Sequence, residues 1–155
     1  MTNLTGVIQR GGTNGGLQIR LTSAERGGEL GVVEMHMPPH SGGPPLHVHP
    51  THGEGFYVLA GHPAFQLGAQ VLTGDTGAWV FAPRDTPHTL ANPHHEPALL
   101  LCIFAPGGFE RRFERMLAKQ SGGTLPAELA ELTEAERATR MVGPPLSLAL
   151  NSQSP

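Results

Sequence analysis

Three histidines and one glutamate stand at spacings that could bring their side chains to one point in space. His47 and His49 form the pattern H-x-H, and residues two apart in an extended strand point to the same face. Glu54 follows five residues after His49, and the segment between them contains Pro and Gly, so the chain can turn and begin a new strand. A third imidazole is available from His88, in the strand-like stretch TPHTL.

These side chains have the chemistry of a metal site. Three neutral imidazoles and one carboxylate make a mixed nitrogen and oxygen donor set that suits Fe(II), Mn(II), Ni(II), Cu(II) or Zn(II) without selecting among them. Four ligands leave one or two positions open on a metal that prefers about five or six, so a substrate oxygen could bind there. The sequence therefore predicts a divalent transition metal held by His47, His49, Glu54 and His88.

The chain that carries these residues is expected to be all β. Short apolar or alternating stretches are separated by clusters of Gly, Pro, Asn and Asp, a pattern typical of a β-sandwich or barrel. The expected strands cover residues 7–9, 17–21, 30–37, 54–59, 64–67, 78–81, 86–91 and 98–104.

Helical periodicity begins after Pro106. Phe109, Phe113, Met116 and Leu117 predict an amphipathic helix over residues 109–120 that packs on the barrel, and Gly122 would stop it. A second helix is expected from residue 126 to about 141, followed by an extended tail. We expect a single domain in which residues 1–105 form a β-barrel and residues 106–155 form a helical appendage and tail.

Composition and charge exclude several function classes. The 155 residues suffice for one core, and Lys+Arg 10 against Asp+Glu 13 gives a net charge of -3, which indicates no basic surface for nucleic acid. The longest apolar run has eight residues, well short of the roughly twenty that span a membrane. The first residues lack the apolar stretch of a secretory signal, and a single Cys cannot form an internal disulfide, so a cytoplasmic location is expected.

Two stretches resemble the sequence motifs of the cupin superfamily. The first motif is commonly G-x5-H-x-H-x3-4-E-x6-G, and the match here falls on His47, His49, Glu54 and Gly61. Ser41 stands where the leading Gly is expected, and Gly42 follows it.

The second cupin motif, G-x5-P-x-G-x2-H-x3-N, matches at Gly77, Pro83, His88 and Asn92. Asp85 replaces the central Gly, and Asp tolerates a left-handed backbone better than most residues, so the turn is expected to survive. The chain resembles in particular the small single-domain cupins that are similar to quercetin dioxygenase.

This resemblance implies a jelly-roll β-barrel that holds the metal inside, and it also implies a homodimer. A barrel of this size can enclose one small ligand. Strand parity relative to the metal ligands then gives Phe56, Val58 and Leu90 as candidate walls of a substrate pocket. Phe65, Phe81 and Met35 are further candidates.

The resemblance also implies a dioxygenase. Its small enolisable or phenolic, flavonol-like substrate would react with O2 beside the metal after Glu54 takes a proton from it as the catalytic base. Two alternatives stay open: an isomerase, lyase or decarboxylase that uses the metal as a Lewis acid, and a non-catalytic small-molecule-binding protein. Residues 30–105 contain no Lys and a single Arg, Arg84, which favours a neutral substrate over an anionic one.

The remaining residues of interest receive structural interpretations. His52 is expected to be a solvent-facing turn residue, Cys102 a buried small hydrophobe, and Trp79 a core residue. His36 is expected on a sheet face or beside the metal ligands rather than among them. The helix is expected to expose its charged side chains, Glu110, Arg111, Arg112, Glu114 and Arg115.

Overall fold

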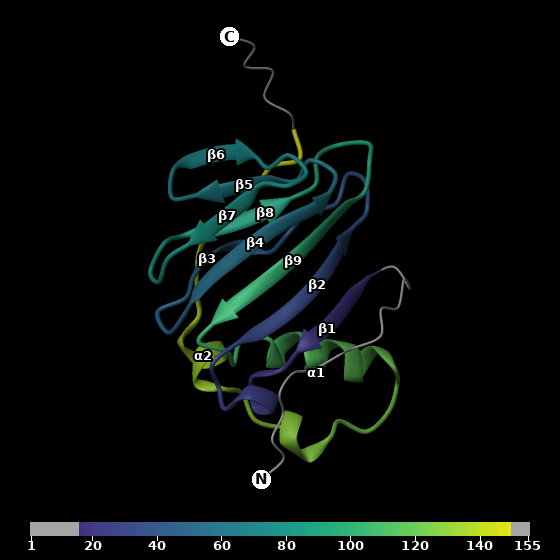
Figure 1. Ribbon diagram of the computed structural model, residues 1–155, viewed down its shortest axis with the longest axis vertical. Coiled ribbons are helices and arrows are strands. Elements are labelled where there is room, and N and C mark those ends of the chain that lie inside the picture. Colours follow the sequence, from purple (N-terminus) through teal and green to yellow (C-terminus); the bar gives the residue numbers. More distant parts are fainter. Residues whose placement is uncertain (1–15, 150–155) are drawn as a thin grey trace.

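The computed structural model describes residues 16–149, and these are mostly β-strands with short helices towards the C-terminal side (Figure 1). The predicted strand over residues 7–9 lies outside the described residues. The elements in chain order are β1 (Leu17–Leu21), η1 (Ser23–Arg26), β2 (Gly31–Met37), β3 (Pro45–Val48), β4 (Gly53–Ala60), β5 (Ala64–Leu67), β6 (Gln70–Thr73), β7 (Trp79–Ala82), β8 (His88–Ala91), β9 (Ala98–Ala105), α1 (Arg111–Gln120), η2 (Ala127–Leu129), α2 (Glu134–Ala138) and β10 (Arg140–Pro145).

The strands form two antiparallel sheets, each of five strands. One sheet has the order β1-β2-β9-β4-β7, and the other has the order β10-β3-β8-β5-β6. The crossing connections between the sheets make a jelly roll, so the predicted fold class is confirmed. Within residues 16–149, no helix is long and apolar enough to cross a membrane.

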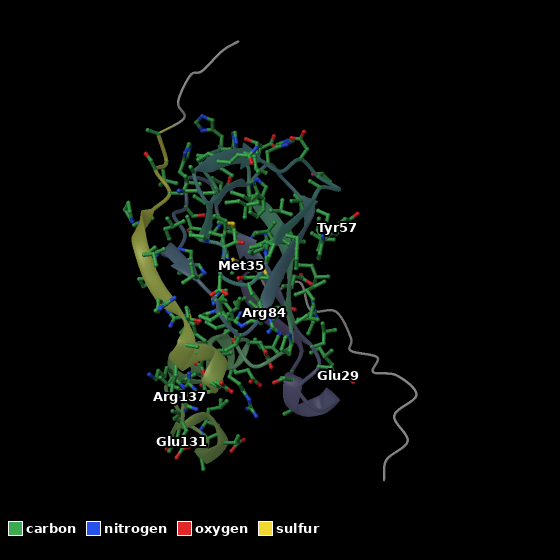
Figure 2. The ribbon with its side chains drawn as sticks, turned by 90° about the vertical axis from the view of Figure 1, so that its left-hand side faces the viewer. Glu29, Met35, Tyr57, Arg84, Glu131 and Arg137 are labelled. Carbon is green, nitrogen blue, oxygen red and sulfur yellow. The ribbon has the colours of Figure 1, made fainter. Side chains whose placement is uncertain are left out.

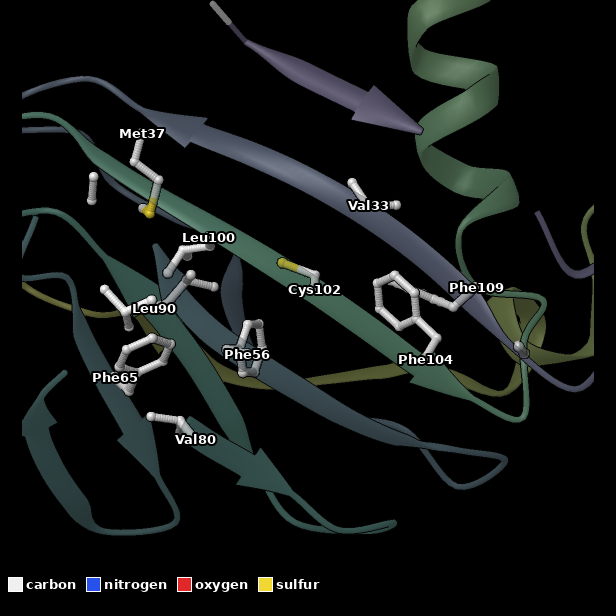
Figure 3. Packing of buried hydrophobic residues seen from close by; sticks show 13 residues of the cluster. Val33, Met37, Phe56, Phe65, Val80, Leu90, Leu100, Cys102, Phe104 and Phe109 are labelled. Carbon is white, nitrogen blue, oxygen red and sulfur yellow. The ribbon is translucent and has the colours of Figure 1, made fainter. Parts of the chain in front are cut away.

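The core lies between the sheets because alternate residues of each strand point inward. Strand β9 shows this alternation clearly: Leu100, Cys102 and Phe104 are buried, and the residues between them are only partly covered. Phe56 and Val58 of β4 meet them from the same sheet, and Phe65 and Leu90 come from the opposite one (Figure 3). Cys102 is a buried residue of an apolar strand, as predicted, and burial raises the pKa of its thiol.

In strand β7, the residues that alternate with Trp79 point into the core, so Trp79 itself points outward. Val80 and Ala82 point inward, so Trp79 and Phe81 lie on the outer face and are 54% and 48% exposed. They cover Gly53 and Gly55 of β4, where an added Cβ would meet the Phe81 and Trp79 rings. The core position predicted for Trp79 is therefore wrong.

Helix α1 agrees with the helix predicted over residues 109–120, but the predicted second helix is wrong. The segment instead contains η2, the five-residue α2, and the strand β10, which pairs with β3. Thr133 opens α2 with a capping box to Glu136. Thr139 is already extended, because from Arg140 onward the backbone bonds to a neighbouring strand instead of continuing a helix.

Two of the charged residues expected on a solvated helix face are buried. Glu110 accepts hydrogen bonds from the Ser23 and Gly108 backbone N–H groups, both at 2.6 Å, and so joins the start of α1 to the barrel. Arg115 pairs with Glu136 and donates 2.7 Å from its Nε to the Leu129 carbonyl oxygen. Both side chains fix the C-terminal elements at one end of the sheets, where Figure 1 shows them.

Candidate metal centre

The four predicted ligands come from three strands of both sheets. His47 lies in β3 and pairs in register with His88, the first residue of the neighbouring β8, while His49 directly follows β3. Glu54 is the second residue of β4 in the facing sheet. The turn over residues 49–53 thus carries the chain from one sheet to the other, so that three imidazoles face one carboxylate across the barrel interior.

These four side chains meet in a buried cluster. One ligand atom from each lies within 4.8 Å of the ligand atoms of the other three. The Oε2 atom of Glu54 lies 3.1 Å from Nε2 of His49 and 2.9 Å from Nε2 of His88. No side chain in the cluster is more than 8% exposed.

The other ring nitrogens of His47 and His88 fix which atoms face the cluster. Nδ1 of His47 lies 2.7 Å from the Pro45 carbonyl oxygen, and Nδ1 of His88 lies 2.8 Å from that of Thr86. A carbonyl oxygen only accepts, so both Nδ1 atoms carry hydrogen and donate it. In a neutral ring, Nε2 then keeps its lone pair and points into the cluster.

His49 is oriented by a residue from the C-terminal segment. Its Nδ1 lies 2.8 Å from Oγ1 of Thr139, and that hydroxyl donates its own hydrogen to the Ala135 carbonyl oxygen at 2.8 Å. The Thr139 oxygen therefore accepts from His49. All three imidazoles share one tautomer, which is the arrangement that partners around metal-binding histidines impose.

Burial and hydrogen bonding act in opposite directions on the ionisation of the cluster. Burial would raise the pKa of Glu54, but hydrogen bonds from His49 and His88 outweigh it and lower that pKa to about 2. Burial lowers the pKa of His47 to about 4. Burial also acts to lower the pKa of His88, but the hydrogen bond and charge of Glu54 raise it overall.

The donor set fits a divalent transition metal. Imidazole lone pairs on Nε2 face an ionised carboxylate oxygen at about 3 Å, so a proton or a cation must lie between them. A divalent ion would satisfy the carboxylate and the three imidazoles together, and nitrogen and oxygen donors suit first-row metals. The four residues could therefore hold such an ion, as the sequence predicted; its identity is not set by these donors.

His52 is buried, contrary to the solvent-facing position predicted for it. Its ring is 1% exposed and stacks on the His49 ring at a centroid distance of 4.2 Å. Its Nδ1 lies 2.9 Å from Oγ1 of Thr51, and its Nε2 has no hydrogen-bond partner among the described residues. Burial, together with the nearby His49, lowers the pKa of His52 to about 4, so this neutral ring supports His49 from behind.

The turn before His88 tolerates the replacement of Gly by Asp. Asp85 has a φ of 62°, a left-handed conformation that Gly adopts easily and Asp tolerates better than most residues. Its backbone N–H also donates to the His49 carbonyl oxygen at 3.1 Å. The expectation that this turn survives is confirmed, and the turn links the loops that carry two of the ligands.

A cavity of about 440 Å³ reaches the cluster at His47 and Glu54. Of the six predicted pocket residues, Met35, Phe56 and Leu90 line it, and Figure 2 shows Met35 between the sheets. Val58 and Phe65 lie in the core and do not line the cavity. Phe81 does not line it either, because the parity of β7 turns this side chain to the outer surface.

The cavity wall also includes residues between 36 and 44 and several residues of the C-terminal segment, which the sequence analysis assigned only to packing. Phe109 contributes from just before α1, and Arg112, Phe113 and Met116 contribute from α1 itself. Thr139 contributes from the residue before β10, and Met141 contributes from within β10. The spacing of the apolar helix residues contained a signal for Arg112, since residue 112 shares their helix face. Nothing local in the sequence indicates that Thr139 reaches His49.

Fold and cluster together define a class of protein: jelly rolls with a buried site of three histidines and one glutamate open to an internal cavity. The Cupin domain family model matches residues 33–104, which include all four side chains of the cluster. This match and the jelly-roll fold support the cupin superfamily for this chain. No curated protein matches it.

Solved structures show the same fold at low sequence identity. A cupin protein from Bacteroides fragilis superposes with a TM-score of 0.54 at 19% identity, over 65% of this chain and 85% of that one. A predicted oxalate decarboxylase from Thermotoga maritima gives 0.55 at 20%, over 58% and 78%. KdgF from Halomonas sp. gives 0.52 at 22%, over 58% and 76%. These similarities establish the fold and do not single out a dioxygenase.

Proposed function

We propose that the protein is a metal-dependent dioxygenase that acts on a small enolisable or phenolic substrate. The observation that carries this proposal is that His47 and Glu54 belong both to the buried four-residue cluster and to the wall of the cavity. A substrate in the cavity can therefore reach the ligand side chains directly. A bound divalent transition metal would supply positive charge to stabilise a substrate oxyanion and a centre at which an electron-rich substrate can react with O2.

Glu54 is the base in this proposal. In the metal-free cluster, hydrogen bonds from His49 and His88 lower its pKa to about 2, and the charge of a bound divalent ion would likewise favour the ionised carboxylate. An enol or phenol placed beside Oε2 can give its proton to this carboxylate, and the resulting anion is electron-rich.

The apolar wall positions the substrate and excludes water. Met35, Phe56 and Leu90 enclose the cavity on the barrel side, so a ring or alkyl group gains contact area there. Exclusion of water strengthens the electrostatic effect of the cluster on the reacting oxygen. A cavity of this volume that remains open beside the cluster favours ligand binding over a purely structural metal.

An isomerase, lyase or decarboxylase is the second candidate. It is favoured by the ionised Glu54 carboxylate, which can move a proton without any oxidant. Such a reaction would use the same four residues and the same cavity, but it would consume no O2.

Metal analysis followed by oxygen uptake tests the proposal. The purified protein should bind about one divalent ion per chain, and His88→Ala should abolish that uptake because one of four donors is lost. The metal-loaded protein should then consume O2 with at least one member of a panel of flavonols and enolisable diketones. Glu54→Gln should lower the rate by about two orders of magnitude or more.

Each alternative has its own result. Exchange of a substrate proton with deuterium oxide in the absence of O2 uptake would support the isomerase, lyase or decarboxylase. Saturable ligand binding without turnover would support a non-catalytic protein. Near-normal metal uptake by His88→Ala would contradict the metal site itself.

A further inference from the structure

One face of α1 closes the cavity, and that face carries a cation. Phe109, Arg112, Phe113 and Met116 follow the spacing i, i+3, i+4, i+7, which places their side chains on one side of a helix. All four line the cavity that reaches Glu54. Arg112 thus projects from an otherwise apolar helix face toward the space in which a substrate would bind.

Arg112 differs from its two neighbouring arginines in having no acidic partner. Arg111 pairs with Glu114 at 3.4 Å, and Arg115 is buried in its pair with Glu136. Among the side chains that the structure describes, no carboxylate forms an ion pair with the Arg112 guanidinium, and Arg112 is exposed to solvent. Its five N–H donors are available to a ligand.

The carboxylates that line the cavity are already committed. Glu136 receives the Arg115 guanidinium and the Thr133 backbone N–H, the latter at 2.8 Å. Glu54 is held by His49 and His88. A negative group on a bound molecule would therefore be repelled near these side chains and attracted by Arg112, the single Arg or Lys among the lining residues of this part of the chain.

We propose that Arg112 binds the carboxylate of the substrate, and that the substrate is a small amphipathic monocarboxylic acid. This inference rests on the proposed function for the location of the reacting group at Glu54. A guanidinium matches a carboxylate through two parallel hydrogen bonds. One cation balances one negative charge, and the apolar wall suits the body of the acid, whereas a phosphate dianion would find no second cation among the lining residues.

A carboxylic acid substrate differs from the neutral substrate that the sequence analysis favoured. The low number of cations in residues 30–105 favoured a neutral molecule, but the helix that lies outside that range contributes its own arginine to the cavity. The substrate charge is therefore set by α1 rather than by the barrel.

Binding of hydrocinnamate and of its neutral amide, measured by calorimetry on the full chain, tests the proposal. Both probes are measured with metal-free and metal-loaded protein, so that a carboxylate bound to the metal is recognised by its metal dependence. In wild-type protein without metal, the acid should bind about tenfold or more tightly than the amide, as expected for one charge-assisted contact. Arg112→Gln should remove this preference, and Arg112→Lys should keep part of it.

Arg111→Gln is the matched control, because Arg111 does not line the cavity and already pairs with Glu114. It should retain the preference for the acid. Three results would each overturn the inference. Wild type could bind the acid and the amide equally, it could bind neither measurably, or Arg112→Gln could keep the wild-type preference for the acid. If the protein binds no metal but keeps the Arg112-dependent preference for the acid, only the proposed function is overturned. If Arg112→Gln leaves O2 uptake unchanged and wild type binds the acid and the amide equally, only the inference about Arg112 is overturned.

Discussion

Each imidazole of the cluster has one nitrogen bonded to an acceptor that holds the ring in place. Two of these acceptors are backbone carbonyl oxygens from residues two positions earlier in the chain, at Pro45 and Thr86. The third is the side chain of Thr139, which is ninety positions away from His49. The orientation of His49 is therefore the one that a single side-chain substitution can change without altering a ligand.

Removing the Thr139 hydroxyl should weaken metal binding. Thr139→Val keeps the shape of the side chain but leaves the His49 Nδ1–H without its acceptor, so the dissociation constant for Zn(II) or Co(II) should rise about 10–100-fold. Competition with a chromophoric chelator measures the change. Thr139→Ser retains the acceptor and should stay near wild type; equal affinities for Thr139→Val and wild type would show that Thr139 does not orient the ligand.

His52 should make the metal-free protein sensitive to acid. Burial lowers the pKa of His52 from 6.5 to about 4, so between these values the unfolded chain takes up a proton that the folded protein does not. The folded state therefore loses stability as pH falls through this window. His47 acts in the same direction, because burial lowers its pKa to about 4 as well.

The measurement is the thermal midpoint in the presence of a chelator at pH 7.5 and at pH 5. In His52→Phe the fall in midpoint should be smaller than in wild type, since one of the two groups is gone. His36→Phe, at an exposed position of β2, is the control and should behave as wild type. An identical fall in His52→Phe and wild type would show that His52 is protonated equally in both states.

At the scale of elements, the segment before β3 packs directly on the strand that carries His88. The Thr89 hydroxyl donates to the Pro44 carbonyl oxygen at 2.6 Å. A Cβ added at Gly43 would lie 1.8 Å from the Leu90 carbonyl oxygen, whereas a Cβ added at Gly42 would meet no atom within 4 Å. Two adjacent glycines therefore differ sharply in what they allow.

Gly43→Ala should destabilise the protein by about 1–3 kcal/mol, because the backbone of β8 must move to accept the methyl group. It should also weaken metal binding, since His88 moves with that strand. Gly42→Ala should leave both quantities near wild type. Chemical denaturation and chelator competition measure them, and equal stability of the two variants would contradict the close packing of Gly43 on β8.

Elements with a clear local pattern were predictable from the sequence, whereas a strand defined by pairing with a distant part of the chain was not. The strands that carry the ligands were predictable because the H-x-H spacing and the position of Glu54 are patterns within a few neighbouring residues. The strands β6 and β10 were missed, and β10 was mistaken for the end of a helix, because its pairing with β3 involves residues more than ninety positions away. Trp79 was misplaced because two glycines on the neighbouring strand admit large rings on the outer face, and an apolar residue type alone does not show which face it occupies.

At the scale of the whole molecule, four large apolar side chains lie together on one outer surface. Tyr57 and Leu59 of β4 and Trp79 and Phe81 of β7 lie on the outer face of their sheet and are 39–54% exposed. Figure 2 shows Tyr57 pointing away from the barrel. The homodimer implied by the cupin resemblance would cover such a surface, and contiguous exposed apolar side chains often mark protein contacts.

We therefore expect the outer face of β4 and β7 to form the dimer contact. Trp79→Ser combined with Phe81→Ser should shift the protein from dimer to monomer in sedimentation velocity at micromolar concentration. Val71→Ser is the control, because Val71 is 57% exposed but belongs to β6 in the other sheet. A wild-type monomer, or a variant that stays dimeric, would contradict this contact.

The reach of Thr139 to His49 also has a consequence for the order of events during translation. The ribosome adds ninety residues after His49 before the residue that orients its ring exists. A nascent chain contains all four ligands once His88 has been added, yet it completes the support of the centre only when β10 pairs with β3. We therefore expect an unfinished chain that lacks Thr139 to bind an ion more weakly than the finished protein does.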